Sequence, residues 1–544
     1  MLIRIVTVKL VSTCLLFGLD IESGGSLSRE QAAIDVKHYR IDIRVDPYKK
    51  TIIGKVDITF QLFESTDQLT FDLLNRYSVS GVSVNNTHLS FKKENNKIKV
   101  ANPGLPTFKD HLLTIKYGGK PPVAKNPPWD GGVTWSKDSE GLPWVSVSCQ
   151  TNGAHIWFPC KEHPSDKADG AEIIITAPEQ LIAVGNGLLI SKEKQKDRWV
   201  KWHWQTNFPI SAYNINFAIG NFELVETTSY LFEDPLKIEY YVLPEKITGA
   251  KNLICEAEEY TQFYARAFGA YPWTKERLGF VHTPFSGMEH QTSIAYGNDY
   301  KKTKLGYDFI LFHELGHEWW GNFLSVADWS DFWIHEGICT YSEVMYVEET
   351  FGKDVMFAFV KERLKKNISN KAPIIPQNGS TAKHKSGNDV YYKAAHVLHS
   401  IRYFIGKDIL WKTLKEFLNM PKELENNQTS TREFVSLLNE NSESDLAWVF
   451  EQYMEKKELP TLLIKEKKRK GKRFIDLWWE EDGFKMPIEI SYMAIEGSRM
   501  KKVDLNNTPK RFVVPDSTGY VLDPNGWILF NKKMIKGDAV EKIK

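Results

Sequence analysis

The sequence predicts a multidomain α+β protein with an N-terminal antiparallel β domain, a mainly helical middle domain and a small C-terminal β-sandwich. Two changes in the spacing of apolar residues predict this order, one near residue 226 and one near residue 457. The 544 residues, 42% hydrophobic and 26% charged, suit a globular chain of about three domains. This composition excludes a disordered or fibrous protein.

The first 25 residues differ from the rest of the chain. Arg4 and Lys9 accompany an apolar run over residues 10–19. A charged start followed by a short apolar run is typical of a signal peptide, and it predicts export to the periplasm or the medium. The alternative is an N-terminal extension of a cytoplasmic protein. No stretch approaches the roughly 20 apolar residues of a membrane-spanning helix, so we expect no integral membrane span.

Alternating apolar and polar residues dominate residues 26–225. Examples are YRIDIRV, GKVDITFQL and AEIIITAP, which are bounded by Asn, Gly, Pro and Asp. Such alternation predicts antiparallel strands that each bury one face. We therefore expect an all-β N-terminal domain.

Over residues 226–457 apolar residues recur three and four positions apart, as in KNLICEAEEYTQFYARAFG and YYKAAHVLHSIRYFIG. This spacing predicts amphipathic helices. Strand patterns return over residues 458–544, in TLLIKEKK, RFIDLWWEE and MPIEISYMAI, and suit a small β-sandwich. The basic run Lys465–Arg473 contains Gly471 and is predicted to form a hairpin tip.

The charge balance argues against a nucleic-acid-binding protein, and the cysteine content argues against a disulfide-rich or cysteine-zinc protein. Lys and Arg number 70 against 69 Asp and Glu, so the net charge of +1 provides no field to attract a polyanion. We expect no nucleic-acid partner. The five cysteines are odd in number and widely spaced, which argues against a disulfide framework and against a cysteine zinc site.

The stretch FILFHELGHEWWGN contains the pattern HExxH. His313 and His317 are four residues apart, so on a helix both can bind one zinc ion from the same face. Glu314 lies about 100° around the helix from His313. It can reach the edge of the site without binding the ion, and it is the expected general base for attack by zinc-activated water.

A catalytic zinc takes three protein ligands and leaves one position for water. Glu336 follows His317 by nineteen residues, on what is predicted to be the next helix. We expect it to be the third ligand of a single zinc ion in a His2Glu site. Glu343 is expected either to accept a hydrogen bond from a ligating histidine or to be an exposed helix residue.

These motifs resemble those of the aminopeptidase N and leukotriene hydrolase family, gluzincin metallopeptidases with HExxH and a glutamate as third ligand. The family's GxMEN loop corresponds to Ser286–His290, with Ser in place of the first Gly and His in place of Asn. Three further family motifs have counterparts here: HExWxGN at His317–Asn322, WxNEG at Trp333–Gly337 and YEKG at Tyr391–Ala394. The family's CQ pair corresponds to Cys149 and Gln150, and the WFPC run follows it in the sequence.

The resemblance implies a thermolysin-like catalytic domain over residues 226–457 and zinc-dependent removal of N-terminal amino acids from peptides with a free N-terminus. It implies catalytic roles for Glu314 and Tyr391, with the Tyr391 hydroxyl stabilising the oxyanion and Tyr392 facing elsewhere. It also implies that substrate is bound by Glu289, which holds the α-ammonium group, by Gln150, and by the loop residues Gly287 and Met288.

Two other functions stay open on the same site: an epoxide hydrolase like the bifunctional relative, and a catalytically silent peptide-binding protein. We also expect no helical C-terminal domain of the kind that longer family members have, and therefore an open active site.

Overall fold

The computed structural model describes residues 23–151, 153–376, 379–382, 387–494 and 497–535. The expected signal peptide over residues 1–25 lies outside these ranges except for its last three residues. Ser23 is buried in the fold, where its carbonyl oxygen accepts from the amide of Ala382 at 2.9 Å and its hydroxyl accepts from Trp329 Nε1 at 3.0 Å. Within the described ranges, no helix combines the length and hydropathy needed to cross a membrane.

An eight-stranded sheet forms most of the N-terminal domain. Buried and partly exposed residues largely alternate along its first strand, as predicted for a sheet with one buried face. One pair, β1 with β12, is parallel instead of antiparallel, because these strands are far apart in the sequence and no hairpin fixes their direction. The strands, in sheet order, are β14 (Leu188–Gln195), β15 (Trp199–Thr206), β12 (Gly170–Pro178), β1 (Ile34–Asp46), β2 (Thr51–Leu62), β8 (His111–Gly119), β4 (Ser78–Val84) and β5 (Thr87–Leu89).

Smaller sheets complete the N-terminal domain. One of them leads directly to a predicted site residue, because its strand β10 ends two residues before Gln150. The sheets are β13 (Ile182–Gly185), β17 (Phe217–Gly220), β10 (Pro143–Ser148) and β9 (Gly132–Lys137); β3 (Gln68–Asp72), β7 (Lys97–Ala101) and β6 (Phe91–Glu94); and β11 (Lys167–Ala168) with β16 (Ile210–Ser211). The short helix α1 (Arg29–Ala32) precedes β1.

The middle domain contains a five-stranded sheet that the helical spacing does not predict. Every residue of β20 and β22 is buried, so these strands lack the alternation by which a half-exposed strand is found in a sequence. The first strand, β18, begins at residue 223 and pairs with β19, so it crosses the expected domain boundary between residues 225 and 226. The strands, in sheet order, are β18 (Glu223–Ser229), β19 (Leu236–Val242), β20 (Leu278–His282), β22 (Ile294–Tyr296) and β21 (Gly287–Met288).

The rest of the middle domain is mainly helical, as predicted. The helices are α2 (Ile247–Phe268), α3 (Phe309–Gly316), α4 (Trp333–Phe351), α5 (Lys353–Phe359), α6 (Tyr392–Ile405), α7 (Lys407–Asn419), α8 (Thr431–Ser442) and α9 (Ala447–Tyr453). Two strands of two residues each, β23 (Ser325–Val326) and β24 (Gln428–Thr429), pair with each other.

Strands return after residue 460, in two sheets. The predicted hairpin tip is confirmed: β25 and β26 pair from Leu462 with Trp479 to Arg469 with Lys472, and Lys470 and Gly471 make the turn with φ of 51° and 72°. The first sheet contains β29 (Lys510–Pro515), β26 (Lys472–Trp479), β25 (Thr461–Arg469) and β31 (Asn531–Met534), and the second contains β28 (Gly497–Val503), β27 (Ile488–Ala494) and β30 (Tyr520–Leu522).

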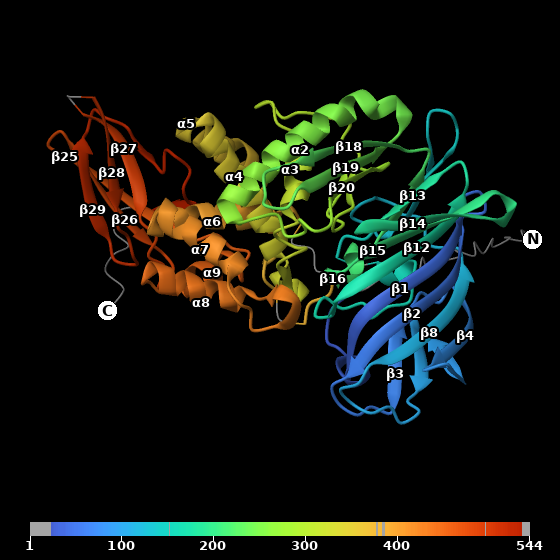
Figure 1. The fold of residues 1–544 in the computed structure, drawn as a ribbon. Helices are drawn as coiled ribbons and strands as arrows, with labels where there is room; N and C mark the ends of the chain where they lie inside the picture. The colour runs from blue at the N-terminus through green and yellow to red at the C-terminus, as the bar shows by residue number, and fades with distance from the viewer. Residues whose placement is uncertain (1–22, 152, 377–378, 383–386, 495–496, 536–544) are drawn as a thin grey trace, which may run out of the picture.

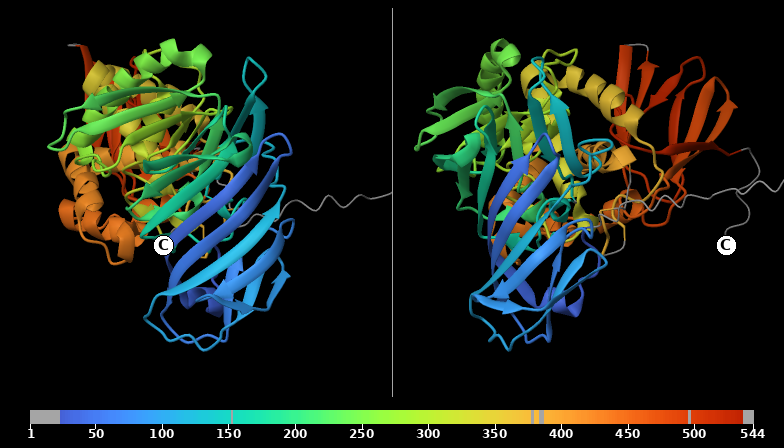
Figure 2. Two further views of the ribbon diagram at one scale, coloured as in Figure 1. Left: turned by 45° about the vertical axis from the view of Figure 1, so that its right-hand side comes forward. Right: turned by 90° about the vertical axis from the view of Figure 1, so that its right-hand side faces the viewer.

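The helices lie between the two groups of sheets. Figure 1 shows the N-terminal sheets on one side of the helices and the red C-terminal sheets on the other. The right-hand view of Figure 2 shows the red sheets beside the helices and away from the blue strands. Trp527 joins the C-terminal sheets to α6, since its ring stacks on His399 at 4.4 Å and on Tyr403 at 5.1 Å between centroids.

Candidate active site

Helix α3 carries His313 and Glu314, His317 is its C-cap residue, and the helix is held firmly. Its N-cap residue Asp308 accepts a hydrogen bond from the amide of Leu311 at 3.2 Å. Leu311, Phe312 and Leu315 are buried against the core. A Cβ atom at Gly316 would lie 2.3 Å from the hydroxyl oxygen of Tyr264, so glycine allows α2 and α3 to pack closely here. A rigid helix fixes the side chains of His313, Glu314 and His317.

The predicted zinc ligands come together. Nε2 of His313 lies 3.2 Å from Nε2 of His317 and 3.1 Å from Oε2 of Glu336, which is in the first turn of α4. Nε2 of His317 lies 3.3 Å from the same carboxylate oxygen. In a tetrahedral site with zinc–ligand bonds of 2.0–2.1 Å, two ligand atoms are about 3.3–3.4 Å apart. The donor types and their separations therefore fit one zinc ion.

Surrounding groups orient these ligands. Nδ1 of His317 lies 2.9 Å from the carbonyl oxygen of Trp320, so a proton on Nδ1 leaves Nε2 free for a metal. Glu336 accepts from Gln150 Nε2 through its other oxygen at 3.2 Å. Glu343 has neither of its expected roles. It is buried, its carboxylate accepts from Tyr307 at 3.0 Å, and no hydrogen bond between described residues joins it to a ligating histidine.

Two further carboxylates lie beside the ligands. Oxygens of Glu289 and Glu314 and a ring nitrogen of His317 all lie within 4.8 Å of one another. Burial raises the pKa of Glu289 to about 7, an effect that the Glu336 charge adds to and the His317 charge opposes. Burial, with the charges of Glu289 and Glu336, also raises the pKa of Glu314. Carboxyl groups with raised pKa values are suited to accepting and returning protons near neutral pH.

The loop that carries Glu289 contacts Glu314 directly. Gly287 and Met288 form the short edge strand β21, and Met288 is buried. A Cβ atom at Gly287 would lie 2.5 Å from Oε1 of Glu314 and 2.7 Å from Cγ2 of Ile310. Ser286, the first of the two departures from the family pattern in this loop, precedes this contact and leaves it intact.

Gln150 and Tyr391 meet at the site from two domains. Nε2 of Gln150 donates to the hydroxyl oxygen of Tyr391 at 2.8 Å, and the Tyr391 ring lies 5.9 Å from the His313 ring. The neighbouring Tyr392 instead stacks near the guanidinium of Arg363, at 5.3 Å. Tyr391 is thus the tyrosine of this pair whose hydroxyl is hydrogen-bonded beside the metal ligands.

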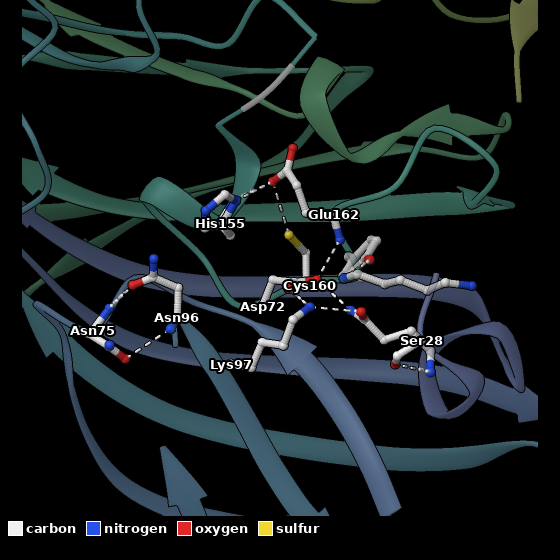
Figure 3. Close-up of polar contacts among 11 residues, drawn as sticks. Ser28, Asp72, Asn75, Asn96, Lys97, His155, Cys160 and Glu162 are labelled. Carbon is white, nitrogen blue, oxygen red and sulfur yellow. Dashed lines mark hydrogen bonds and ion pairs between the residues drawn. The ribbon is translucent and has the colours of Figure 1, made fainter. Parts of the chain in front are cut away.

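A buried ion pair holds the segment after Gln150. Oε2 of Glu162 lies 2.9 Å from Nδ1 of His155 and accepts from the His155 amide at 2.7 Å, while Oε1 accepts from the amide of Gly153 at 3.2 Å. The amide of Glu162 donates to Asp72, which also pairs with Lys97 at 2.7 Å. Figure 3 shows these side chains gathered around Asp72 and Glu162.

A second buried network, which the sequence interpretation did not assign, holds the Glu289 loop. Glu318 accepts from the amide of Thr292 at 2.8 Å and from Trp273 Nε1 at 2.6 Å. Nδ2 of Asn322 donates to the carbonyl oxygen of Glu289 at 3.0 Å. Both Glu318 and Asn322 stand in the HEWWGN stretch, so the motif could have revealed them.

Two residues of the N-terminal domain that no motif marks also face this loop. Asn214 Nδ2 donates to Asn322 Oδ1. Tyr213 is buried, and burial together with the charges of Glu289 and Glu336 raises the pKa of its phenol. Their position follows from the meeting of the two domains, which sequence periodicity does not report.

Two family models match the chain. Residues 35–214 match the peptidase M1 N-terminal domain, and residues 257–453 match the peptidase family M1 domain. Endoplasmic reticulum aminopeptidase 1 of Homo sapiens is 26% identical over 301 residues, which are 52% of this chain and 32% of that protein. Glutamyl aminopeptidase of Sus scrofa is 25% identical over 476 residues, 80% of this chain and 48% of that protein. The chain thus spans from about a third to half the length of these relatives.

Solved structures share the fold. An M1 zinc metallopeptidase from Deinococcus radiodurans aligns with a TM-score of 0.65 and 21% identity, covering 79% of this chain and 95% of that one. Legionella pneumophila aminopeptidase A in complex with aspartic acid aligns with a TM-score of 0.75 and 18% identity, covering 93% and 60%.

Proposed function

Because the chain belongs to peptidase family M1, we propose that it is a zinc-dependent aminopeptidase that removes N-terminal residues from peptides with a free α-amine. One observation carries this proposal: the donor atoms of His313, His317 and Glu336 lie 3.1–3.3 Å apart with the carboxylates of Glu289 and Glu314 beside them. A single zinc ion held by these three residues would polarise the scissile carbonyl and acidify a water.

Glu314 performs the proton transfers in this proposal. Its buried carboxylate accepts a proton from the attacking water and later gives it to the leaving amine. The backbone at Gly287 packs closely against Oε1 of Glu314. This contact fixes the position of the oxygen that takes up the proton.

Tyr391 stabilises the negative charge that develops on the carbonyl oxygen. Its hydroxyl oxygen accepts from Gln150, and in this proposal the phenol donates its own proton to that oxygen.

Glu289 selects for a free N-terminus. It is 2% exposed, and its Oε1 has no hydrogen-bond partner among the described residues. An α-ammonium group would satisfy this buried oxygen, whereas an acylated amine would leave a buried carboxylate unpaired. The aminopeptidases among the relatives support an exopeptidase rather than an endopeptidase.

Two finer features belong to the same proposal. We infer that the two C-terminal sheets form a small β-sandwich, since Tyr492 of one packs on Phe512 of the other at 5.3 Å. Export follows if residues 1–25 are a signal peptide. Sequencing the N-terminus of the protein recovered from its cell of origin tests this.

Hydrolysis of leucyl and alanyl p-nitroanilides by zinc-loaded protein tests the function. We expect p-nitroaniline release that a chelator abolishes, that fails on N-acetylated substrate, and that falls at least about 10³-fold in Glu314→Gln. The control Glu349→Gln changes an exposed carboxylate of α4 and should keep wild-type rates. Peptide binding without turnover would indicate the silent peptide-binding protein, and epoxide opening without peptide turnover would indicate the epoxide hydrolase.

A further inference from the structure

Arg363 is a half-buried cation that forms no ion pair with any of the described residues. It lies in the π-helical turn Val360–Leu364, which continues α5. In the part of the chain that the structure describes, no carboxylate lies within ion-pair distance of its guanidinium group, and no residue accepts a hydrogen bond from it. A guanidinium keeps its charge and has five N–H donors, so this side chain has unused binding capacity.

Two aromatic rings hold the guanidinium in place. Its central carbon lies 4.2 Å from the ring centre of Phe309 and 5.3 Å from that of Tyr392. Contacts with ring faces leave the N–H groups at the edge of the guanidinium free for a planar acceptor. Glu343 is influenced by this charge, but its carboxylate is bound by Tyr307 and forms no ion pair with Arg363.

Phe309 connects Arg363 to the metal ligands. It stands one helical turn before His313, with ring centroids 5.6 Å apart, and it is itself half-buried. The distances from Arg363 to the Phe309 ring and from there to the His313 ring add up to about 10 Å, which roughly three extended residues cover. A peptide of about three residues at the metal site is therefore long enough to span this distance.

The position of Glu289 gives the direction of that peptide. Glu289 and Glu314 lie beside His317, whereas Phe309, Tyr391 and Arg363 lie on the side of His313. With the α-ammonium group at Glu289, the residues after the scissile bond extend past His313 towards Arg363.

We propose that Arg363, held between Phe309 and Tyr392, forms a subsite for a carboxylate on the part of the peptide that follows the scissile bond. This carboxylate is either the C-terminus of a short peptide or an acidic side chain. A planar carboxylate can accept two hydrogen bonds from one guanidinium. The proposal rests on the proposed aminopeptidase function and adds to it a preference among substrates.

Paired substrates test the subsite. Leu-Ala-Ala is compared with Leu-Ala-Ala-NH2, and Leu-Ala-Glu-NH2 with Leu-Ala-Gln-NH2, by kcat/KM on zinc-loaded protein. We expect a preference of about tenfold or more for the charged member of at least one pair, which identifies the source of the carboxylate. In Arg363→Gln this ratio should fall to about one, and Arg363→Lys should retain part of it because the charge remains without the planar fork. Lys366→Gln, which removes an exposed charge three residues away, should keep the wild-type ratio.

Both substrates of a pair are assayed with the same protein preparation. A partly unfolded fraction therefore lowers both kcat/KM values equally and leaves their ratio unchanged. Equal kcat/KM values within both pairs for the wild type, or an unchanged ratio in Arg363→Gln, would overturn the proposal. Calorimetric binding of Leu-Ala-Ala and Leu-Ala-Ala-NH2 to Glu314→Gln, alone and combined with Arg363→Gln, gives a readout that needs no turnover. Absence of leucyl p-nitroanilide hydrolysis would refute the proposed function separately, while the binding ratios still decide the role of Arg363.

Discussion

Gly287 and Glu314 are in such close contact that a single methyl group at residue 287 cannot be accommodated. Its carbon would lie 2.5 Å from Oε1 and 2.8 Å from Cγ of Glu314. The loop that carries Glu289, the carboxylate proposed to bind the α-ammonium group, thereby also sets the position of the proposed general base. One glycine links the substrate-binding and proton-transfer parts of the site.

Replacing this glycine should therefore impair turnover without removing the metal. In Gly287→Ala we expect kcat to fall about 10²-fold, because a shift of about 1 Å in a catalytic group has an effect of this size. Zinc content should stay equimolar, since the ligands are unchanged. Gly519→Ala is the matched control, because a Cβ atom there meets no atom within 4 Å. Wild-type kcat in Gly287→Ala would contradict the close contact.

Loss of the Asn322 side chain should weaken substrate binding more than turnover. Its Nδ2 donates to the carbonyl oxygen of Glu289 at 3.0 Å and to Glu318 at 3.2 Å. Without these bonds the Glu289 loop is less well positioned, so Asn322→Ala should raise KM about tenfold with a smaller change in kcat. Steady-state kinetics on a leucyl anilide measure both. A fall in kcat with KM unchanged would show that Asn322 does not position Glu289.

Metal binding should stabilise the fold through Glu336. A ligand that binds only the native state raises stability by about 2.7 kcal/mol at 100 times its dissociation constant. Added zinc should therefore raise the melting temperature of the chelated wild type and restore its activity. Glu336→Ala should lose most of its zinc by elemental analysis and show little rise. Equal zinc content in both proteins would exclude Glu336 as a ligand.

The buried pair His155–Glu162 should make stability depend on pH. Burial favours the neutral imidazole, but the hydrogen bond and charge of Glu162, with the charge of Asp72, outweigh it and raise the pKa of His155 above 6.5. The stabilisation is then complete below about pH 6.5, the pKa of an unfolded histidine. It is lost as the pH rises through the higher pKa of the folded state.

Urea unfolding of wild type and Glu162→Gln between pH 5.5 and 8.5 measures this effect. The difference in unfolding free energy should be largest at low pH and shrink on the alkaline side, with a slope of at most about 1.4 kcal/mol per pH unit for one proton. A difference that grows with pH would show that His155 is neutral in the native state.

Local patterns in the sequence are sufficient to predict features that lie within one helix, one strand or one hairpin. The spacing of His313 and His317 predicts that both lie on one helical face, and alternation along β1 and β2 predicts a half-buried sheet. The hairpin at Gly471 follows from turn residues between two strand patterns. In each case the interacting residues are neighbours along the chain.

Only the tertiary structure places Gln150 against Tyr391 and Glu336, Asn214 against Asn322, and Arg363 between Phe309 and Tyr392. The buried strands β20 and β22 and the parallel pairing of β1 with β12 were likewise visible only in the tertiary structure. These contacts join residues distant in sequence, and they depend on how domains pack. Helical or strand periodicity records which face of an element is buried, but it carries no information about which distant element covers that face.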